Sequence, residues 1–110
     1  MTSMVIIGAG PGGYEAASVA AAGGVDVTVV EETGIGGAAV LTDCVPSKTL
    51  IATAEVTSTL RRAAELGLRH TETFEVDLDA VNSRVRQLAQ AQSDDISRGL
   101  ERKGVRLISG

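Results

Sequence analysis

The sequence has few of the residues that build disulfide networks and aromatic cores. Cys44 is the only cysteine among its 110 residues, which excludes an internal disulfide framework and a cysteine-based metal site. Aromatic residues make up 2% of the chain. The sheet and helices of a packed core must therefore meet through valine, isoleucine, leucine and alanine.

Long apolar runs and dense positive charge are also missing. No apolar run approaches the roughly 20 residues that a membrane-spanning helix needs. The net charge is -4, and no basic cluster exceeds Arg61-Arg62, which argues against nucleic-acid and membrane partners. Met1-Thr2-Ser3 leads directly into an apolar run and leaves no room for a signal peptide. A cytoplasmic location is therefore expected.

The first apolar run, Val5-Ile6-Ile7, breaks into a G-x-G-x-x-G pattern made by Gly8, Gly10 and Gly13. This pattern is typical of a strand, tight turn and helix that bind a dinucleotide pyrophosphate through backbone N–H groups. Gly8 would make the turn, Gly10 would let the phosphates approach the main chain, and Gly13 would let the helix pack closely on the strand. Pro11 suits the first helical turn, where its missing N–H costs no hydrogen bond.

The surroundings strengthen this pattern, which alone is a weak signal in a chain with 13 glycines. A helix-forming run over residues 15–22 follows and ends at Gly23-Gly24. The alternating run 25–30 then predicts a second strand that ends at Glu31. A carboxylate about 20 residues past the glycines is where a ribose hydroxyl is bound in dinucleotide sites. Glu31 is therefore the candidate ribose ligand; the alternative is an ordinary glycine-rich turn with an exposed acid.

A helix is expected to restart around Pro46-Ser47, because proline costs about 3 kcal/mol in a helix interior. It is predicted to continue to Leu66, with Gly67 as its C-cap. His70 stands alone among polar residues. We therefore expect it in a surface loop and predict no metal site.

Asp77 or Asp79 can cap the next helix. Apolar residues recur at three- and four-residue steps over 81–100, with a gap at Gln92, and predict an amphipathic helix of about 20 residues. The helix is interpreted as covering one face of the sheet, with a partner-binding or dimer role as the alternative. Gly104 ends it, and residues 105–108 predict a third strand. Strands that alternate with helices predict an α/β fold, a Rossmann-like parallel sheet with flanking helices.

A second glycine-rich loop, residues 33–37, precedes Cys44-Val45-Pro46-Ser47-Lys48. With the first glycine motif and Glu31, this order resembles the flavoprotein disulfide reductases, the family of dihydrolipoamide dehydrogenase and glutathione reductase. The family's second block is G-G-T-C-x4-C-x-P-S-K, and the resemblance covers essentially the whole chain. It implies that residues 1–110 are the N-terminal part of an incomplete FAD-binding domain.

The chain departs from the family at the redox-active disulfide. Cys44 matches the second cysteine of the pair, and Ala39 stands where the first is expected. A methyl group cannot form a disulfide, so the dithiol relay is missing from this segment. The resemblance then implies an NAD(P)H-dependent flavoprotein that reduces quinones or similar small-molecule acceptors. The alternatives are an atypical dihydrolipoamide dehydrogenase and a stand-alone nucleotide-binding module without catalysis.

The resemblance also implies the remaining site residues. Gly36, Gly37 and Ala38 would border the cofactor, and the catalytic candidates Cys44 and Lys48 would face the isoalloxazine ring. Cys44 is interpreted as an activated thiol that donates charge into the oxidised flavin, or as a small buried apolar side chain. Lys48 is interpreted as the cation that stabilises negative charge on the reduced ring, or as a solvated lysine.

No second G-x-G-x-x-G motif is present, so these residues carry no evidence of a nicotinamide site. The family's longer chains have a nicotinamide-binding domain and an interface domain, which implies a homodimer that uses NAD(P)H as co-substrate. We therefore expect a fragment of a longer chain rather than a free-standing module. The segment alone is expected to be inactive, to retain FAD weakly, and to expose sheet edges and an unburied flank.

Overall fold

The computed structural model describes residues 1–69 and 73–110. His70, predicted to lie in a surface loop, is outside the described residues. The elements in chain order are β1 (Ser3–Ile7), α1 (Pro11–Ala22), β2 (Asp26–Glu31), α2 (Gly37–Leu41), α3 (Cys44–Arg61), the 3₁₀ helix η1 (Ala63–Leu66), α4 (Leu78–Arg102) and β3 (Arg106–Ser109).

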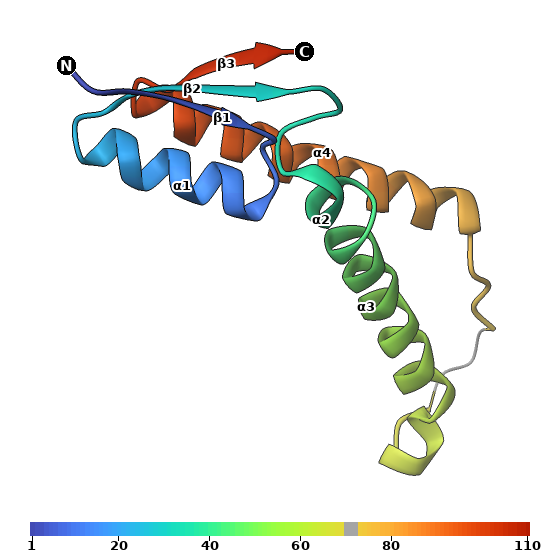
Figure 1. The fold of residues 1–110 in the computed structure, drawn as a ribbon. Helices are drawn as coiled ribbons and strands as arrows, with labels where there is room; N and C mark the ends of the chain where they lie inside the picture. Colours follow the sequence, from blue (N-terminus) through green and yellow to red (C-terminus); the bar gives the residue numbers. More distant parts are fainter. Residues whose placement is uncertain (70–72) are drawn as a thin grey trace.

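The strands form one parallel sheet with β2 in the middle (Figure 1). The register pairs Ile6 of β1 with Val29 of β2, and Val29 with Leu107 of β3. α1 and the C-terminal half of α4 lie against one face of this sheet (Figure 1). The predicted α/β fold with a parallel sheet and flanking helices is therefore confirmed.

The core lies between the sheet and these two helices. Val27 and Val29 of β2 are at most 1% exposed, and they pack with Ala17 of α1 and Leu100 of α4. Burial of each such aliphatic side chain contributes about 1.5–3 kcal/mol. The core is thus built from aliphatic side chains, as the scarcity of aromatic residues predicts.

The opposite face of the sheet is open in the described chain. Ile7, Val30 and Ile108 are partners across the three strands, on the side away from α1 and α4. Ile7 is 88% exposed and Ile108 is 50% exposed. Parallel sheets in α/β proteins are normally covered on both faces. This open face is the expected unburied flank, and it is apolar.

The boundaries predicted for α3 are wrong at both ends. The helix begins at Cys44 rather than around Pro46-Ser47. Pro46 is tolerated because it lies in the first turn, where backbone N–H groups have no partner within the helix. The helix ends at Arg61 rather than near Leu66, because the chain tightens into η1. Gly67, with φ of +76°, caps η1 instead.

The predicted amphipathic helix is longer than expected. α4 has 25 residues and begins at Leu78. The Asp77 side chain caps it by accepting a hydrogen bond from the Ala80 N–H at 2.9 Å, as predicted for one of the two candidate aspartates. The short helix α2 has no counterpart among the predicted elements.

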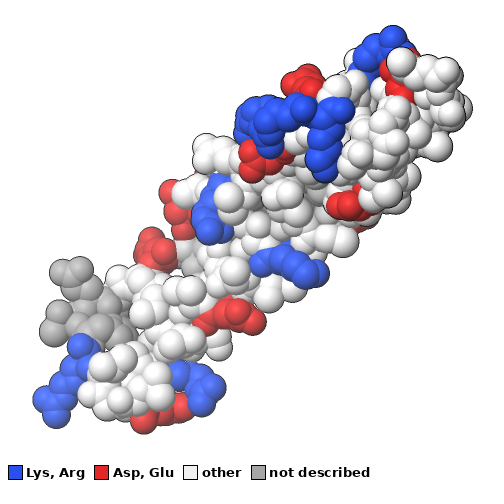
Figure 2. Space-filling view, turned by 90° about the vertical axis from the view of Figure 1, so that its left-hand side faces the viewer, with Lys and Arg blue, Asp and Glu red and all other residues white. Residues whose placement is uncertain are grey.

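The molecule is elongated, with extents of 67 × 25 × 18 Å, because α3 leads away from the sheet (Figure 1). Positive and negative side chains are interspersed along the face shown in Figure 2. Among the helices of the described residues, none combines the length and the apolar character needed to cross a membrane.

Candidate functional site

The first glycine turn joins β1 to α1 in a geometry that requires glycine. Gly8 has φ of +94°, a conformation that glycine adopts without strain. A Cβ atom at Gly13 would lie 1.9 Å from the carbonyl oxygen of Gly8. Helix α1 therefore approaches the turn more closely than any side chain at residue 13 would permit.

The N-terminus of α1 is open. Gly10 is the N-cap and Pro11 the first helical residue, and within residues 1–69 and 73–110 no side chain caps this end. A Cβ atom at Gly10 or Gly12 would meet no atom within 4 Å. The free N–H groups of the first turn and the helix dipole favour an anionic group here. This end of α1 is suited to a phosphate.

Glu31 lies at the end of β2 with its carboxylate beside the glycine turn. Its Oε2 accepts a hydrogen bond from the Ala9 N–H at 2.7 Å. Its Oε1 accepts from the N–H and hydroxyl of Thr33, at 2.8 and 2.9 Å, and from the Gly34 N–H at 3.3 Å. These donors lower the pKa of Glu31 from 4.5 to about 2; the Ala9 N–H makes the largest contribution and the Thr33 donors the next largest. The carboxylate is thus ionised and held in one orientation.

The second glycine loop touches the first. The Gly36 N–H donates to the carbonyl oxygen of Ala9 at 2.8 Å. A Cβ atom at Gly37, where φ is +62°, would lie 2.9 Å from the Cα of Gly10. Both backbone groups of the fully buried Ala9 are therefore engaged, the N–H by Glu31 and the carbonyl by Gly36.

A hollow of about 340 Å³ opens at the carboxyl ends of β2 and β3. Its lining consists of Glu31, Glu32, Thr33, Gly34, Ile35, Leu107, Ile108 and Ser109. Ligands of open α/β sheets bind in the crevice outside the carboxyl ends of the strands. The hollow therefore extends the site from the glycine turn toward β3.

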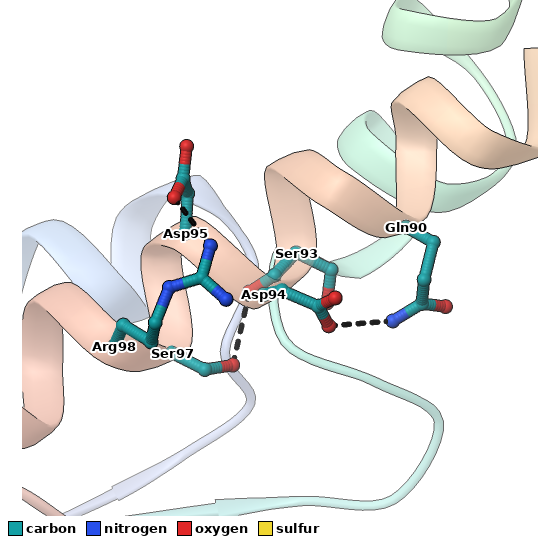
Figure 3. Close-up of polar contacts among 6 residues, drawn as sticks. All are labelled: Gln90, Ser93, Asp94, Asp95, Ser97 and Arg98. Carbon is teal, nitrogen blue, oxygen red and sulfur yellow. Dashed lines mark hydrogen bonds and ion pairs between the residues drawn. The ribbon is translucent and has the colours of Figure 1, made fainter.

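Ser93 of α4 is a site residue that the sequence analysis missed. Its side chain is buried, and its hydroxyl donates to the carbonyl oxygen of Ile35 in the second glycine loop at 2.5 Å. Figure 3 shows it beside other polar contacts of α4, where the Ser97 hydroxyl donates to the Ser93 carbonyl at 2.9 Å. The sequence signal for this contact is the interruption of the apolar pattern at Gln92, because the residue that follows it, Ser93, is small and polar.

The catalytic candidates lie beyond the second loop. Cys44 is the first residue of α3 and its thiol is exposed. The interpretation of Cys44 as a buried apolar side chain is therefore wrong. Lys48 is exposed one turn later, a spacing that places both side chains on the same side of the helix. Ala39 lies in α2, five positions before Cys44.

The fold therefore brings part of the predicted site together. The glycines of both loops and Glu31 converge around Ala9. Pro11 stands at the N-terminus of α1, and Ala38 is exposed in α2. Cys44 and Lys48 follow on α3. The nucleotide-binding candidates share one end of the sheet, and the catalytic candidates start the next long helix.

Comparison with known proteins gives consistent matches over the whole chain. The family model described as "Pyridine nucleotide-disulphide oxidoreductase" matches residues 2–109. A Mycobacterium tuberculosis (strain H37Rv) protein named NAD(P)H dehydrogenase (quinone) is 48% identical over 100% of this chain and 23% of its own length. The dihydrolipoyl dehydrogenase of Chlamydia muridarum is 35% identical over 96% of this chain and 23% of its own length.

Two solved structures are similar. LpdA from Mycobacterium tuberculosis has a TM-score of 0.92 and 49% identity, covering 100% of this chain and 24% of its own. The HOCl-induced flavoprotein disulfide reductase RclA from Escherichia coli has a TM-score of 0.75 at 21% identity, covering 100% of this chain and 22% of its own, and supports the fold alone. The chain thus spans about a quarter of the length of the curated relatives it matches.

Proposed function

The chain belongs to the pyridine nucleotide-disulphide oxidoreductase family, and we propose that it is the N-terminal FAD-binding segment of an NAD(P)H-dependent flavoprotein that reduces quinones or similar small-molecule acceptors. The observation that carries the proposal is that Ala9, in the first glycine loop, is hydrogen-bonded both to the Glu31 carboxylate and to Gly36 of the second loop. This arrangement holds the carboxylate beside the open N-terminus of α1. A dinucleotide needs both features, a place for its diphosphate and a fixed carboxylate nearby.

The residues fit FAD. Gly8, Gly10 and Gly13 keep side chains away from the place where the pyrophosphate meets the first turn of α1. The Glu31 carboxylate accepts a ribose hydroxyl of the adenosine half. The hollow of about 340 Å³ beside Glu31 accommodates that half. Gly36, Gly37 and Ala38 would border the cofactor.

When bound, FAD supplies the two-electron redox chemistry, and the protein contributes binding, orientation and charge. Lys48 would supply a positive charge facing the flavin ring, and Cys44 would supply a thiol facing it. The family has its first redox-active cysteine five positions before the second, and here that position holds Ala39, so Cys44 has no partner sulfur there. Because a dithiol relay needs two sulfurs, we assign the electrons to a diffusible acceptor.

The relatives favour this proposal over its alternatives. The Mycobacterium tuberculosis relative named NAD(P)H dehydrogenase (quinone) is 48% identical, whereas the Chlamydia muridarum dihydrolipoyl dehydrogenase is 35% identical. An atypical dihydrolipoamide dehydrogenase remains the second candidate, and the 35% identical relative supports it. A stand-alone nucleotide-binding module is the third. The proposal includes a homodimer of the full-length protein in the cytoplasm, with NAD(P)H as co-substrate.

The test uses the full-length protein. We expect a yellow protein that releases FAD on denaturation and oxidises NADH or NADPH in the presence of a quinone. Lipoamide turnover comparable with quinone turnover would overturn the choice of acceptor in favour of a dihydrolipoamide dehydrogenase. A colourless protein that binds ADP would instead support the nucleotide-binding module. The 110-residue segment alone is expected to bind FAD weakly and to be inactive.

A further inference from the structure

Thr33 contacts the Glu31 carboxylate twice although its side chain is exposed. Its N–H donates to Oε1 of Glu31 at 2.8 Å, and its hydroxyl donates to the same oxygen at 2.9 Å. An exposed hydroxyl has water available as a partner. Its contact with Glu31 is therefore not required to satisfy a buried polar group.

The contacts of the carboxylate are unequal between its two oxygens. Oε1 accepts three hydrogen bonds, two from Thr33 and one from Gly34, and Oε2 accepts one from Ala9. A carboxylate offers about four lone-pair sites in all, so Oε1 has little capacity left. Donors on both oxygens also prevent rotation of the carboxylate about its last side-chain bond. Oε2 is the oxygen with capacity for a further donor.

We propose that Thr33 is a positioning residue whose hydroxyl fixes the Glu31 carboxylate in the orientation that accepts a ribose hydroxyl of adenosine. This inference rests on the proposed function, since it specifies how the adenosine half of FAD is bound. Preorganising a ligand-binding group raises affinity because its freedom is lost before binding rather than during it. The Ala9 N–H and, after it, the Thr33 donors lower the pKa of Glu31 to about 2, which is consistent with a carboxylate that is held in its charged form.

The test is made on the full-length protein freed of FAD, with Thr33→Val and Thr33→Ser. Valine matches threonine in shape and keeps the N–H but lacks the hydroxyl, whereas serine keeps the hydroxyl. Thr59→Val is the matched control, because Thr59 is an exposed threonine of α3 whose hydroxyl donates to the Glu55 carbonyl at 3.0 Å, away from the site. Dissociation constants are measured for FAD, for ADP and for ADP that lacks both ribose hydroxyls.

We expect Thr33→Val to weaken ADP and FAD binding up to about tenfold, because the Glu31 side chain must then be ordered during binding rather than before it. Thr33→Ser should restore most of the affinity, and Thr59→Val should bind like the wild type. ADP without ribose hydroxyls should bind wild type and Thr33→Val equally, because Glu31 has no hydroxyl to accept. This last comparison separates positioning from general loosening of the loop.

Unchanged ADP affinity in Thr33→Val would overturn the inference while leaving the proposed function intact. An equal loss for ADP with and without its ribose hydroxyls would also overturn it, since the effect would then come from the loop as a whole. A wild-type protein that binds neither FAD nor ADP would overturn the proposed function and this inference together.

Discussion

The proposed nucleotide-binding end of the molecule, which comprises the sheet and the two glycine loops, is stabilised differently from the helical arm, α3 and η1. At the nucleotide-binding end, Val27 and Val29 are at most 1% exposed, and contacts between residues distant in sequence join the two glycine loops. In the arm, large apolar side chains such as Ile51 and Val56 are more than half exposed. The first region thus has a buried hydrophobic core of its own, whereas the arm buries few of its large apolar side chains.

The contacts between the arm and α4 explain this difference. In the arm, the buried Thr49 and the partly buried Thr53 have hydroxyls that donate to carbonyls of their own helix. A hollow of about 310 Å³ remains between α3 and the chain around Val76 and Val81. Such contacts bury little apolar surface, so we expect the arm to open locally more readily than the sheet.

Gly13→Ala should have the largest effect, at the nucleotide-binding end. Its Cβ atom would lie 1.9 Å from the Gly8 carbonyl oxygen, forcing the helix and turn apart at a cost of about 3 kcal/mol. FAD binding by the full-length protein should be lost, as measured by flavin fluorescence. Gly99→Ala is the matched control, because Gly99 lies in α4 away from the glycine turn, its added atom meets only the Arg102 side chain at an ordinary 3.9 Å, and alanine favours the helix by about 0.5–1 kcal/mol. Equal effects of the two substitutions would refute the close-packing argument.

Val29→Ala against Val56→Ala compares the two regions directly. Val29 is fully buried, so its truncation should cost about 2–3 kcal/mol. Val56 is 61% exposed, so its truncation should change stability by less than about 0.5 kcal/mol. Chemical denaturation of the full-length protein measures both. A cost at Val56 as large as that at Val29 would mean that the full-length protein covers the arm there.

The Glu31 carboxylate should make the stability of the nucleotide-binding end depend on pH. Its pKa in the folded chain, about 2, is below the ordinary value of 4.5. Its stabilisation is therefore complete above pH 4.5 and is lost as pH falls toward 2. We expect a loss of about 2 kcal/mol after allowance for solvent screening. Denaturation midpoints at decreasing pH should fall more steeply for wild type than for Glu31→Gln, and parallel profiles would contradict this assignment.

Ser93→Ala should have the smallest effect, on the link between α4 and the second glycine loop. Loss of the hydrogen bond to the Ile35 carbonyl should cost about 1 kcal/mol and weaken FAD binding several-fold. Ser97→Ala is the control from the same helix (Figure 3), because its hydroxyl donates only to the backbone one turn earlier. It should be nearly neutral. If the two variants bind FAD equally well, Ser93 has no part in positioning the loop.

The fold was largely predictable because its signals are local. The glycine spacing from Gly8 to Gly13, the alternation over residues 25–30 and the cap at Asp77 each specify a backbone conformation within a few residues. The start of α3 differs from its prediction because proline disrupts a helix interior, whereas Pro46 occupies a first-turn position. The exposure of Cys44 was also undecided, because burial depends on what packs around a side chain.

The sequence alone determined the strand–turn–helix unit, the parallel direction of the strands and the candidate site residues of both glycine loops. Only the tertiary structure decided that Ala9 joins those loops, that Thr33 holds the Glu31 carboxylate, and that Ser93 reaches a carbonyl 58 residues away. Backbone conformation follows from neighbouring residues, so short patterns record it. Contacts between distant residues depend on how whole elements pack, and no short pattern encodes them.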